Sequence, residues 1–233
     1  MELKGRLKLI ADLIPAGSFL CDIGTDHAYI PIYAVEAGIC SKAVAADIKE
    51  GPVKTAARNV AKRLLQDKID VRLGGGLQPL LKDELDTVVI AGMGGLMITE
   101  ILRESFDKAK AAGILILQPM NDIETVRRYL SENGYEITNE RIAIEEHKVY
   151  NVICTRWTGN IKQYDVFDCF IGRGLFESQD ENLPRYLQKR LLKLNTAIAG
   201  MEKAKNKPDI LEEYKAIKKQ LIEVMTERKL IRL

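Results

Sequence analysis

The sequence is poor in the residues that build metal centres, disulfide frameworks and membrane spans. Two histidines and four cysteines occur among its 233 residues, and no two cysteines have the C-x-x-C spacing of a zinc or redox site. No run of eighteen apolar residues is present, and the opening residues lack the apolar core of a secretory signal. We therefore expect a cytoplasmic protein with reduced thiols, no membrane association and no metal.

The sequence also lacks the three-glycine fingerprint of dinucleotide-binding proteins. Residues 20–29 read LCDIGTDHAY, an apolar strand followed by a turn with a single glycine. Asp26 and Tyr29 stand where the fingerprint has its second and third glycines. A carboxylate at position 26 would repel a pyrophosphate and favours a cationic or polyhydroxylated ligand. S-adenosylmethionine, with its sulfonium, ammonium and ribose, is such a ligand.

Apolar strands alternate with helical segments over residues 1–160. An antiparallel strand pair, 135–144 and 148–155, is expected at the sheet edge because no clear helix separates its members. The pattern predicts an α/β, Rossmann-like fold with a seven-stranded, mostly parallel sheet, the arrangement of methyltransferases and not the six-stranded one of dehydrogenases. The preceding strands are expected at 19–23, 43–46, 71–73, 86–91 and 113–117, and the helices at 4–13, 28–36, 51–65, 96–103 and 123–132.

Residues 161–233 are predicted to form a second, helical domain. Apolar residues recur at spacings of three and four along 183–198 and 211–225, which predicts a coiled-coil hairpin. Residues 184–233 hold 13 basic and 6 acidic residues, a net charge of +7, whereas the rest of the chain carries −5. A basic tail on a mildly acidic body indicates a polyanionic partner, although a solvated, lysine-rich helix surface would give the same count.

The predicted strand ends carry the candidate cofactor residues. Asp22 could reach the ammonium of a cofactor or cap the next helix. Asp47 follows Gly24 by 23 residues, where a carboxylate binds ribose hydroxyls in NAD and S-adenosylmethionine proteins alike, unless it is solvated. Glycines after the third strand allow close approach of a flat adenine, or form a plain turn. The predicted cofactor-binding residues are Asp22, Gly24, Thr25, His27, Asp47, Ile48, Gly75, Gly76, Leu77, Ala91 and Gly92.

Three loops carry side chains suited to an acceptor base. Asp26 could orient or deprotonate a substrate nitrogen, and Tyr29 could stack on a base or simply pack. Gln118 and Asn121 could read the edge of a base, since an amide both donates and accepts, or they belong to a turn around Pro119. The predicted catalytic residues are Asp26, Gln118 and Asn121, and the predicted substrate-binding residues are Tyr29, Met93, Gly94, Lys203, Lys205, Lys207, Lys215, Lys218 and Lys219.

Taken together, these motifs resemble the bacterial tRNA adenine-N1 methyltransferases that modify adenine 22. The shared runs are DIGTDHAY at 22–29, GP at 51–52, AGMGG at 91–95 and LILQP at 115–119. The resemblance covers essentially the whole chain, including the helical end. It implies a class I methyltransferase domain, S-adenosylmethionine as the donor and tRNA as the substrate. It also implies that the helical hairpin helps to hold tRNA.

One position departs from the family pattern. Members often have Gly-Asp-Gly-Leu after the third strand, with the acid near the cofactor adenine, whereas residues 74–77 here read GGGL. Gly75 offers no side-chain acceptor to the adenine amine, so we expect weaker cofactor binding or a substitute group. A dehydrogenase, a catalytically silent interaction module and a methyltransferase with a non-RNA acceptor remain alternatives. The sequence is compatible with a monomer or a weak homodimer.

Overall fold

The computed structural model describes residues 1–204 and 209–230. The chain divides into two compact units, Met1–Gln163 and Tyr164–Leu233, which are described separately. Lys205 and Lys207, two of the predicted substrate-binding residues, lie outside the described residues.

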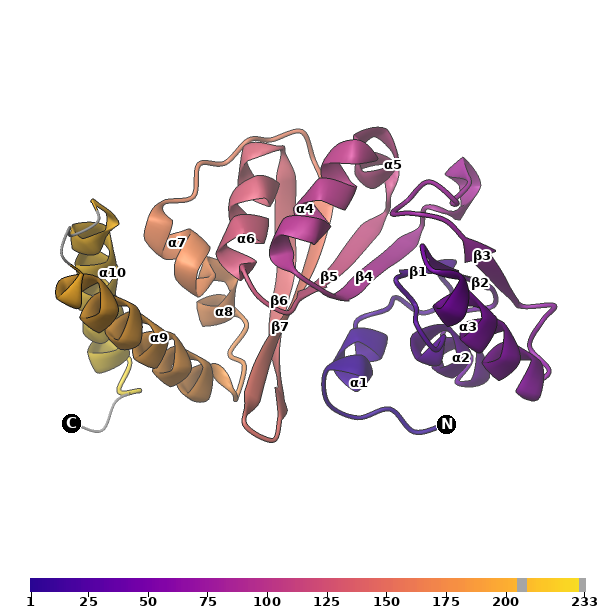
Figure 1. The fold of residues 1–233 in the computed structure, drawn as a ribbon, viewed down its shortest axis with the longest axis horizontal. Coiled ribbons are helices and arrows are strands. Elements are labelled where there is room, and N and C mark those ends of the chain that lie inside the picture. The colour runs from indigo at the N-terminus through magenta and orange to yellow at the C-terminus, as the bar shows by residue number, and fades with distance from the viewer. Residues whose placement is uncertain (205–208, 231–233) are drawn as a thin grey trace. The chain divides into compact units, whose positions relative to one another are not determined.

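The first unit is built on one seven-stranded sheet with the order β3-β2-β1-β4-β5-β7-β6 (Figure 1). Strands β1 to β5 are parallel, and β7 runs antiparallel to both β5 and β6. This confirms the predicted sheet, and the antiparallel β7 distinguishes it from the six-stranded dehydrogenase sheet. The strands are β1 (Leu20–Ile23), β2 (Ala43–Asp47), β3 (Ile69–Leu73), β4 (Thr87–Met93), β5 (Ile114–Pro119), β6 (Tyr135–Glu145) and β7 (Lys148–Trp157).

Helices cover both faces of this sheet because its strands are apolar on both sides. In β1, Leu20 packs into one apolar cluster with α1 to α3, and Cys21 and Ile23 pack into a second cluster with α4 to α6. Figure 1 shows the two helical layers. Burial of both faces is typical of a parallel sheet. The helices are α1 (Gly5–Asp12), α2 (Tyr29–Glu36), α3 (Glu50–Lys62), α4 (Gly95–Glu104), α5 (Phe106–Ala111) and α6 (Ile123–Glu132), with a 3₁₀ turn η1 (Lys82–Glu84).

The second unit is helical, and its two long helices are those predicted from the sequence. Helices α7 (Val166–Ile171) and α8 (Arg173–Glu177) precede α9 (Leu183–Lys203) and α10 (Ile210–Glu227). Arg190 on α9 places its guanidinium 3.6 Å from the centre of the Phe170 ring, which ties α9 to α7. The buried residues of the two long helices are Leu183, Tyr186, Leu187, Arg190, Leu194, Ile198, Leu211, Ile217, Leu221 and Met225.

Three further features bear on function. In residues 1–204 and 209–230, no helix is long and apolar enough to cross a bilayer. Nor does this part of the chain bring three or more histidine, cysteine or acidic side chains together as a metal site. The four cysteines are free thiols and are all buried, and burial raises the pKa of Cys21 and Cys154 to about 12.

Candidate active site

The carboxyl ends of β1 and β4 open onto a cavity of about 260 Å³ in the first unit. These two strands are neighbours at the centre of the parallel sheet, where ligands of α/β proteins bind. The cavity brings together eight of the predicted site residues and three that were not predicted. Its lining is Arg6, Leu7, Asp22, Gly24, Thr25, Asp26, His27, Tyr29, Ile30, Ala91 and Gly92.

Asp22 supplies a buried carboxyl group to this cavity. Asp22 is 4% exposed, and its Oδ2 accepts a hydrogen bond from Thr25 Oγ1 at 2.6 Å. Burial raises the pKa of Asp22 to about 6, the Thr25 hydroxyl opposes that rise, and the charge of Asp47 adds to it. Asp22 does not cap α2, whose N-cap has no side-chain hydrogen bond. A buried carboxylate with one hydroxyl donor is suited to a cationic ligand group.

The turn after β1 depends on Gly24 for two reasons. Its φ of +71° lies in the left-handed region, and a Cβ at this position would overlap the Met93 Cε atom. The amides of Gly24 and Thr25 both donate to Ala46 O, at 2.8 and 3.0 Å, which fastens the turn to β2. Met93, at the end of β4, therefore lies directly against the first turn. Its side chain is half-buried and packs on the core cluster of α4 to α6.

The ends of β2 and β3 hold the remaining predicted cofactor residues, which lie outside the cavity lining. Asp47 is 9% exposed and its Oδ1 accepts from Lys49 N at 2.9 Å, which does not fit the solvated alternative. The Gly74 amide donates to Asp47 O at 2.9 Å and thereby joins the two strand ends. Ile48 is 70% exposed, and its Cδ1 would lie 3.2 Å from a Cβ on Gly75. Gly76 has a φ of +51°, and Leu77 is fully buried.

Asp26, His27 and Tyr29 form an exposed group beside the cavity. Asp26 has a φ of +53° and a side chain that is 67% exposed, and His27 Nε2 lies 3.4 Å from its Oδ2. The His27 and Tyr29 rings are stacked, with centres 5.0 Å apart and planes 11° from parallel. Tyr29 is still 41% exposed, so it is not simply a packing residue. The group presents a carboxylate and an aromatic surface at the mouth of the cavity.

Gln118 has a different position from the one expected of a base-reading amide. It is fully buried, its Oε1 accepts from Gly92 N at 3.1 Å, and its Nε2 donates to Pro119 O at 3.0 Å. Both ends of the amide are therefore occupied, and Gln118 supports the turn at Gly92 instead of facing a ligand. The β4–β5 register shifts between Ala91 and Met93, so this turn is a bulge that needs such support.

Asn121 keeps part of its hydrogen-bonding capacity. Its Oδ1 accepts from Gly95 N at 3.2 Å, while within the described residues its Nδ2 donates to no protein group. Gly94 precedes α4 directly, and a Cβ there would lie 3.0 Å from Asn121 Oδ1. The loops after β4 and β5 are thus in close contact, and the Asn121 amide lies where they meet.

Arg6, which the fold brings to the cavity from α1, is a lining residue that no sequence motif indicates. The Glu145 carboxylate accepts from the Arg6 amide at 2.7 Å and from its Nη1 at 2.8 Å. The guanidinium also lies 5.2 Å from the centre of the Tyr150 ring. Gly5, next to Arg6, has a φ of +55°, which favours glycine, and a Cβ there would require the Glu145 side chain to move. Arg6 is the only arginine or lysine among the lining residues of this cavity.

Three of the predicted lysines, Lys215, Lys218 and Lys219, line a separate hollow of about 510 Å³ on α9 and α10. Lys215 Nζ lies 3.2 Å from carboxylates of Glu202 and Glu212, and Lys219 Nζ lies 4.0 Å from Glu223. Lys203 is exposed at the end of α9. Lys218 lines the hollow and forms no ion pair within the described part of the chain. The local positive charge is therefore smaller than the lysine count implies.

This chain resembles known methyltransferases, in agreement with the geometry of the site. Residues 3–153 match the family model of a methyltransferase domain. The tRNA (adenine(22)-N(1))-methyltransferase of Bacillus subtilis is 38% identical over 184 residues, 78% of this chain and 77% of that protein. The solved structure of the B. subtilis tRNA methyltransferase TrmK superposes with a TM-score of 0.79 at 31% identity, covering 99% of both chains. M. capricolum TrmK in complex with S-adenosyl-homocysteine superposes with a TM-score of 0.78 at 27% identity over all of both chains. The chain belongs to the family of tRNA (adenine(22)-N(1))-methyltransferases.

Proposed function

We propose that this protein transfers a methyl group from S-adenosylmethionine to N1 of adenine 22 in tRNA. The proposal rests on the cavity at the ends of β1 and β4, which is lined by both the buried carboxyl group of Asp22 and the guanidinium of Arg6. The membership of the chain in this family supports it. The cofactor supplies an electrophilic methyl group on a sulfonium. The residues of the protein bind and orient the cofactor and the acceptor adenine around that methyl group.

The cavity suits the amino-acid end of the cofactor, which carries an ammonium and a carboxylate. Asp22 provides a buried negative charge for the ammonium, and Arg6 provides donors for the carboxylate. Asp47 is assigned to the ribose hydroxyls, as a fixed carboxylate at the end of the second strand. Ile48 and the loop from Gly75 to Leu77 are assigned to the adenine, which requires an apolar side chain and close backbone approach.

The acceptor side follows from the chemistry of adenine. N1 of neutral adenine already carries a lone pair, so no base has to remove a proton first. Alignment of N1 with the methyl group is the main task, and such positioning is worth up to about 7–11 kcal/mol. The methylated ring is cationic and shares its charge with the exocyclic amine. Asp26 can accept a hydrogen bond from that amine, and Asn121 has a free N–H to orient the ring.

Access to adenine 22 requires that the base leave its stack in the folded tRNA, at a cost of a few kcal/mol. Tyr29 and Met93 are assigned to contacts with the extruded base, and the second unit to the tRNA backbone. Lys203, Lys215, Lys218 and Lys219 would contact phosphates and make binding salt-dependent. We further propose that the enzyme acts in the cytoplasm, as a monomer or a weak homodimer.

Transfer of labelled methyl from S-adenosylmethionine to unmodified bulk tRNA tests the proposal. Digestion and mass spectrometry of the nucleosides should identify N1-methyladenosine. Cofactor binding without transfer to RNA would favour a methyltransferase with another acceptor. Absence of cofactor binding as well would favour a catalytically silent module on the same fold.

A further inference from the structure

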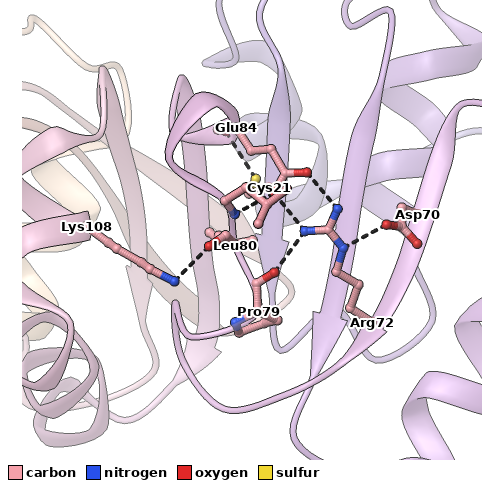
Figure 2. Close-up of polar contacts among 8 residues, drawn as sticks. Cys21, Asp70, Arg72, Pro79, Leu80, Glu84 and Lys108 are labelled. Carbon is pink, nitrogen blue, oxygen red and sulfur yellow. Dashed lines mark hydrogen bonds and ion pairs between the residues drawn. The ribbon is translucent and has the colours of Figure 1, made fainter.

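The segment that follows the glycines of β3 is held by charged side chains in an unusual way. Lys108 on α5 donates through its Nζ to three main-chain carbonyls, those of Leu77, Gln78 and Leu80, at 3.0, 2.8 and 2.7 Å. Figure 2 shows the lysine reaching this segment from the neighbouring helix. An ammonium has three donors, and here all three end on one short stretch of backbone.

A second charged pair holds the rest of the same segment. Arg72 Nη1 donates to Pro79 O at 2.8 Å, and the Glu84 carboxylate accepts from Leu81 N at 2.7 Å. The two side chains bind each other through two hydrogen bonds of 2.7 and 2.6 Å (Figure 2). Pairing with Arg72 lowers the pKa of Glu84, which keeps the carboxylate ionised. Main-chain groups of five consecutive residues, 77–81, are thus fixed from outside the segment.

Three amides that remain free lie directly before the main-chain groups fixed in this way. Within the described residues, the amides of Gly75, Gly76 and Leu77 donate to no protein acceptor, whereas Gly74 N is bound to Asp47 O. Gly75 also has no side chain with which to accept from an adenine amine. Hydrogen bonds from residues 75–77 to the adenine can therefore come only from main-chain groups, whose positions depend on how firmly the following residues are held.

From these contacts we infer that Lys108 is a positioning residue for cofactor adenine recognition. By binding the carbonyls of Leu77, Gln78 and Leu80, it holds the amides of Gly75 to Leu77 in place for the ring nitrogens of the adenine. This role rests on the proposed function, because it assigns the loop to the adenine of S-adenosylmethionine. It explains how a chain without an acid at position 75 retains a defined adenine site.

Lys108→Met tests the inference because it removes the donors and keeps most of the side-chain length. Lys110→Met is the matched control on the same helix, since Lys110 pairs with Asp107 and does not contact the loop. The readouts are calorimetric affinities for S-adenosyl-homocysteine and for S-inosyl-homocysteine. The inosine analogue has an oxygen in place of the adenine amine and a proton on N1, so it reports recognition of the adenine edge.

Lys108→Met should weaken S-adenosyl-homocysteine binding about tenfold, the effect of one lost hydrogen bond to the ligand, and should bring the two affinities close together. Lys108→Arg should retain part of the discrimination, and Lys110→Met all of it. The inference is overturned if Lys108→Met binds like Lys110→Met, or if it weakens both ligands equally while the melting temperature falls. A wild-type protein that bound neither ligand would instead refute the proposed function.

Discussion

Replacement of Asp22 by asparagine should make the protein more stable and abolish its cofactor site. The side chain is 4% exposed, and its pKa rises from an ordinary value of 3.8 to about 6 because burial disfavours the charged form. The folded protein therefore binds a proton more tightly than the unfolded chain does. The contribution of the Asp22 carboxyl group to the free energy of unfolding is therefore fully present at low pH and is lost as pH rises from about 4 to about 6.

The magnitude follows from the two pKa values. Each pH unit between them is worth about 1.4 kcal/mol, so the ionised carboxylate costs on the order of 3 kcal/mol at pH 8 and roughly half of that at pH 5. Asparagine has the same shape and no charge, and its carbonyl oxygen can still accept from Thr25 Oγ1. Asp22→Asn should therefore exceed the wild type by about 3 kcal/mol at pH 8, with a smaller gain at pH 5.

Urea unfolding at pH 5 and pH 8 measures this difference. The single tryptophan, Trp157, lies at the end of β7 in the same unit as Asp22, so its fluorescence reports the relevant transition. S-adenosyl-homocysteine at 100 times its Kd should stabilise the wild type by about 2.7 kcal/mol and should not stabilise the variant. A variant that is less stable than the wild type at pH 8, or a gain that shrinks as pH rises, would refute the reasoning.

Three other substitutions test separate parts of the site. Gly24→Ala should cost at least roughly 1–2 kcal/mol because of its positive φ, and should also displace Met93 and weaken cofactor binding; thermal unfolding and calorimetry measure both effects. Asp26→Ala should lower turnover about 100-fold with cofactor affinity unchanged, and near wild-type turnover would remove Asp26 from the mechanism. Lys218→Ala should weaken tRNA binding and should reduce, by about one, the slope of the logarithm of the binding constant against the logarithm of the salt concentration. An unchanged slope would place Lys218 away from phosphate.

The fold could be predicted from the sequence because its signals are local. Alternating apolar runs and helical segments gave all seven strands, and the turn at Gly24 and the acid at Asp47 follow directly from where two of those strands end. Helix α5 was not predicted because six residues are too few to establish a periodic pattern. The insertion of β7 between β5 and β6 depends on strand pairing, which a single sequence does not encode locally.

The parts of the site that the sequence did not reveal depend on contacts between distant residues. Arg6 reaches the cavity through Glu145, which lies 139 residues further along the chain. Gln118 was expected to face a base, but its amide is bound to Gly92, 26 residues earlier, in a bulge that only strand register defines. No sequence pattern marks Lys108, whose three carbonyl partners lie about 30 residues away.

Methyl transfer to a single position of tRNA is the decisive measurement of the proposed activity. An unmodified tRNA transcript with adenine at position 22 would be incubated with enzyme and S-adenosylmethionine beside a transcript with guanine at that position. We expect one N1-methyladenosine per molecule in the first transcript, mapped to position 22, and none in the second. Equal methylation of both transcripts, or none in either with the cofactor bound, would contradict it.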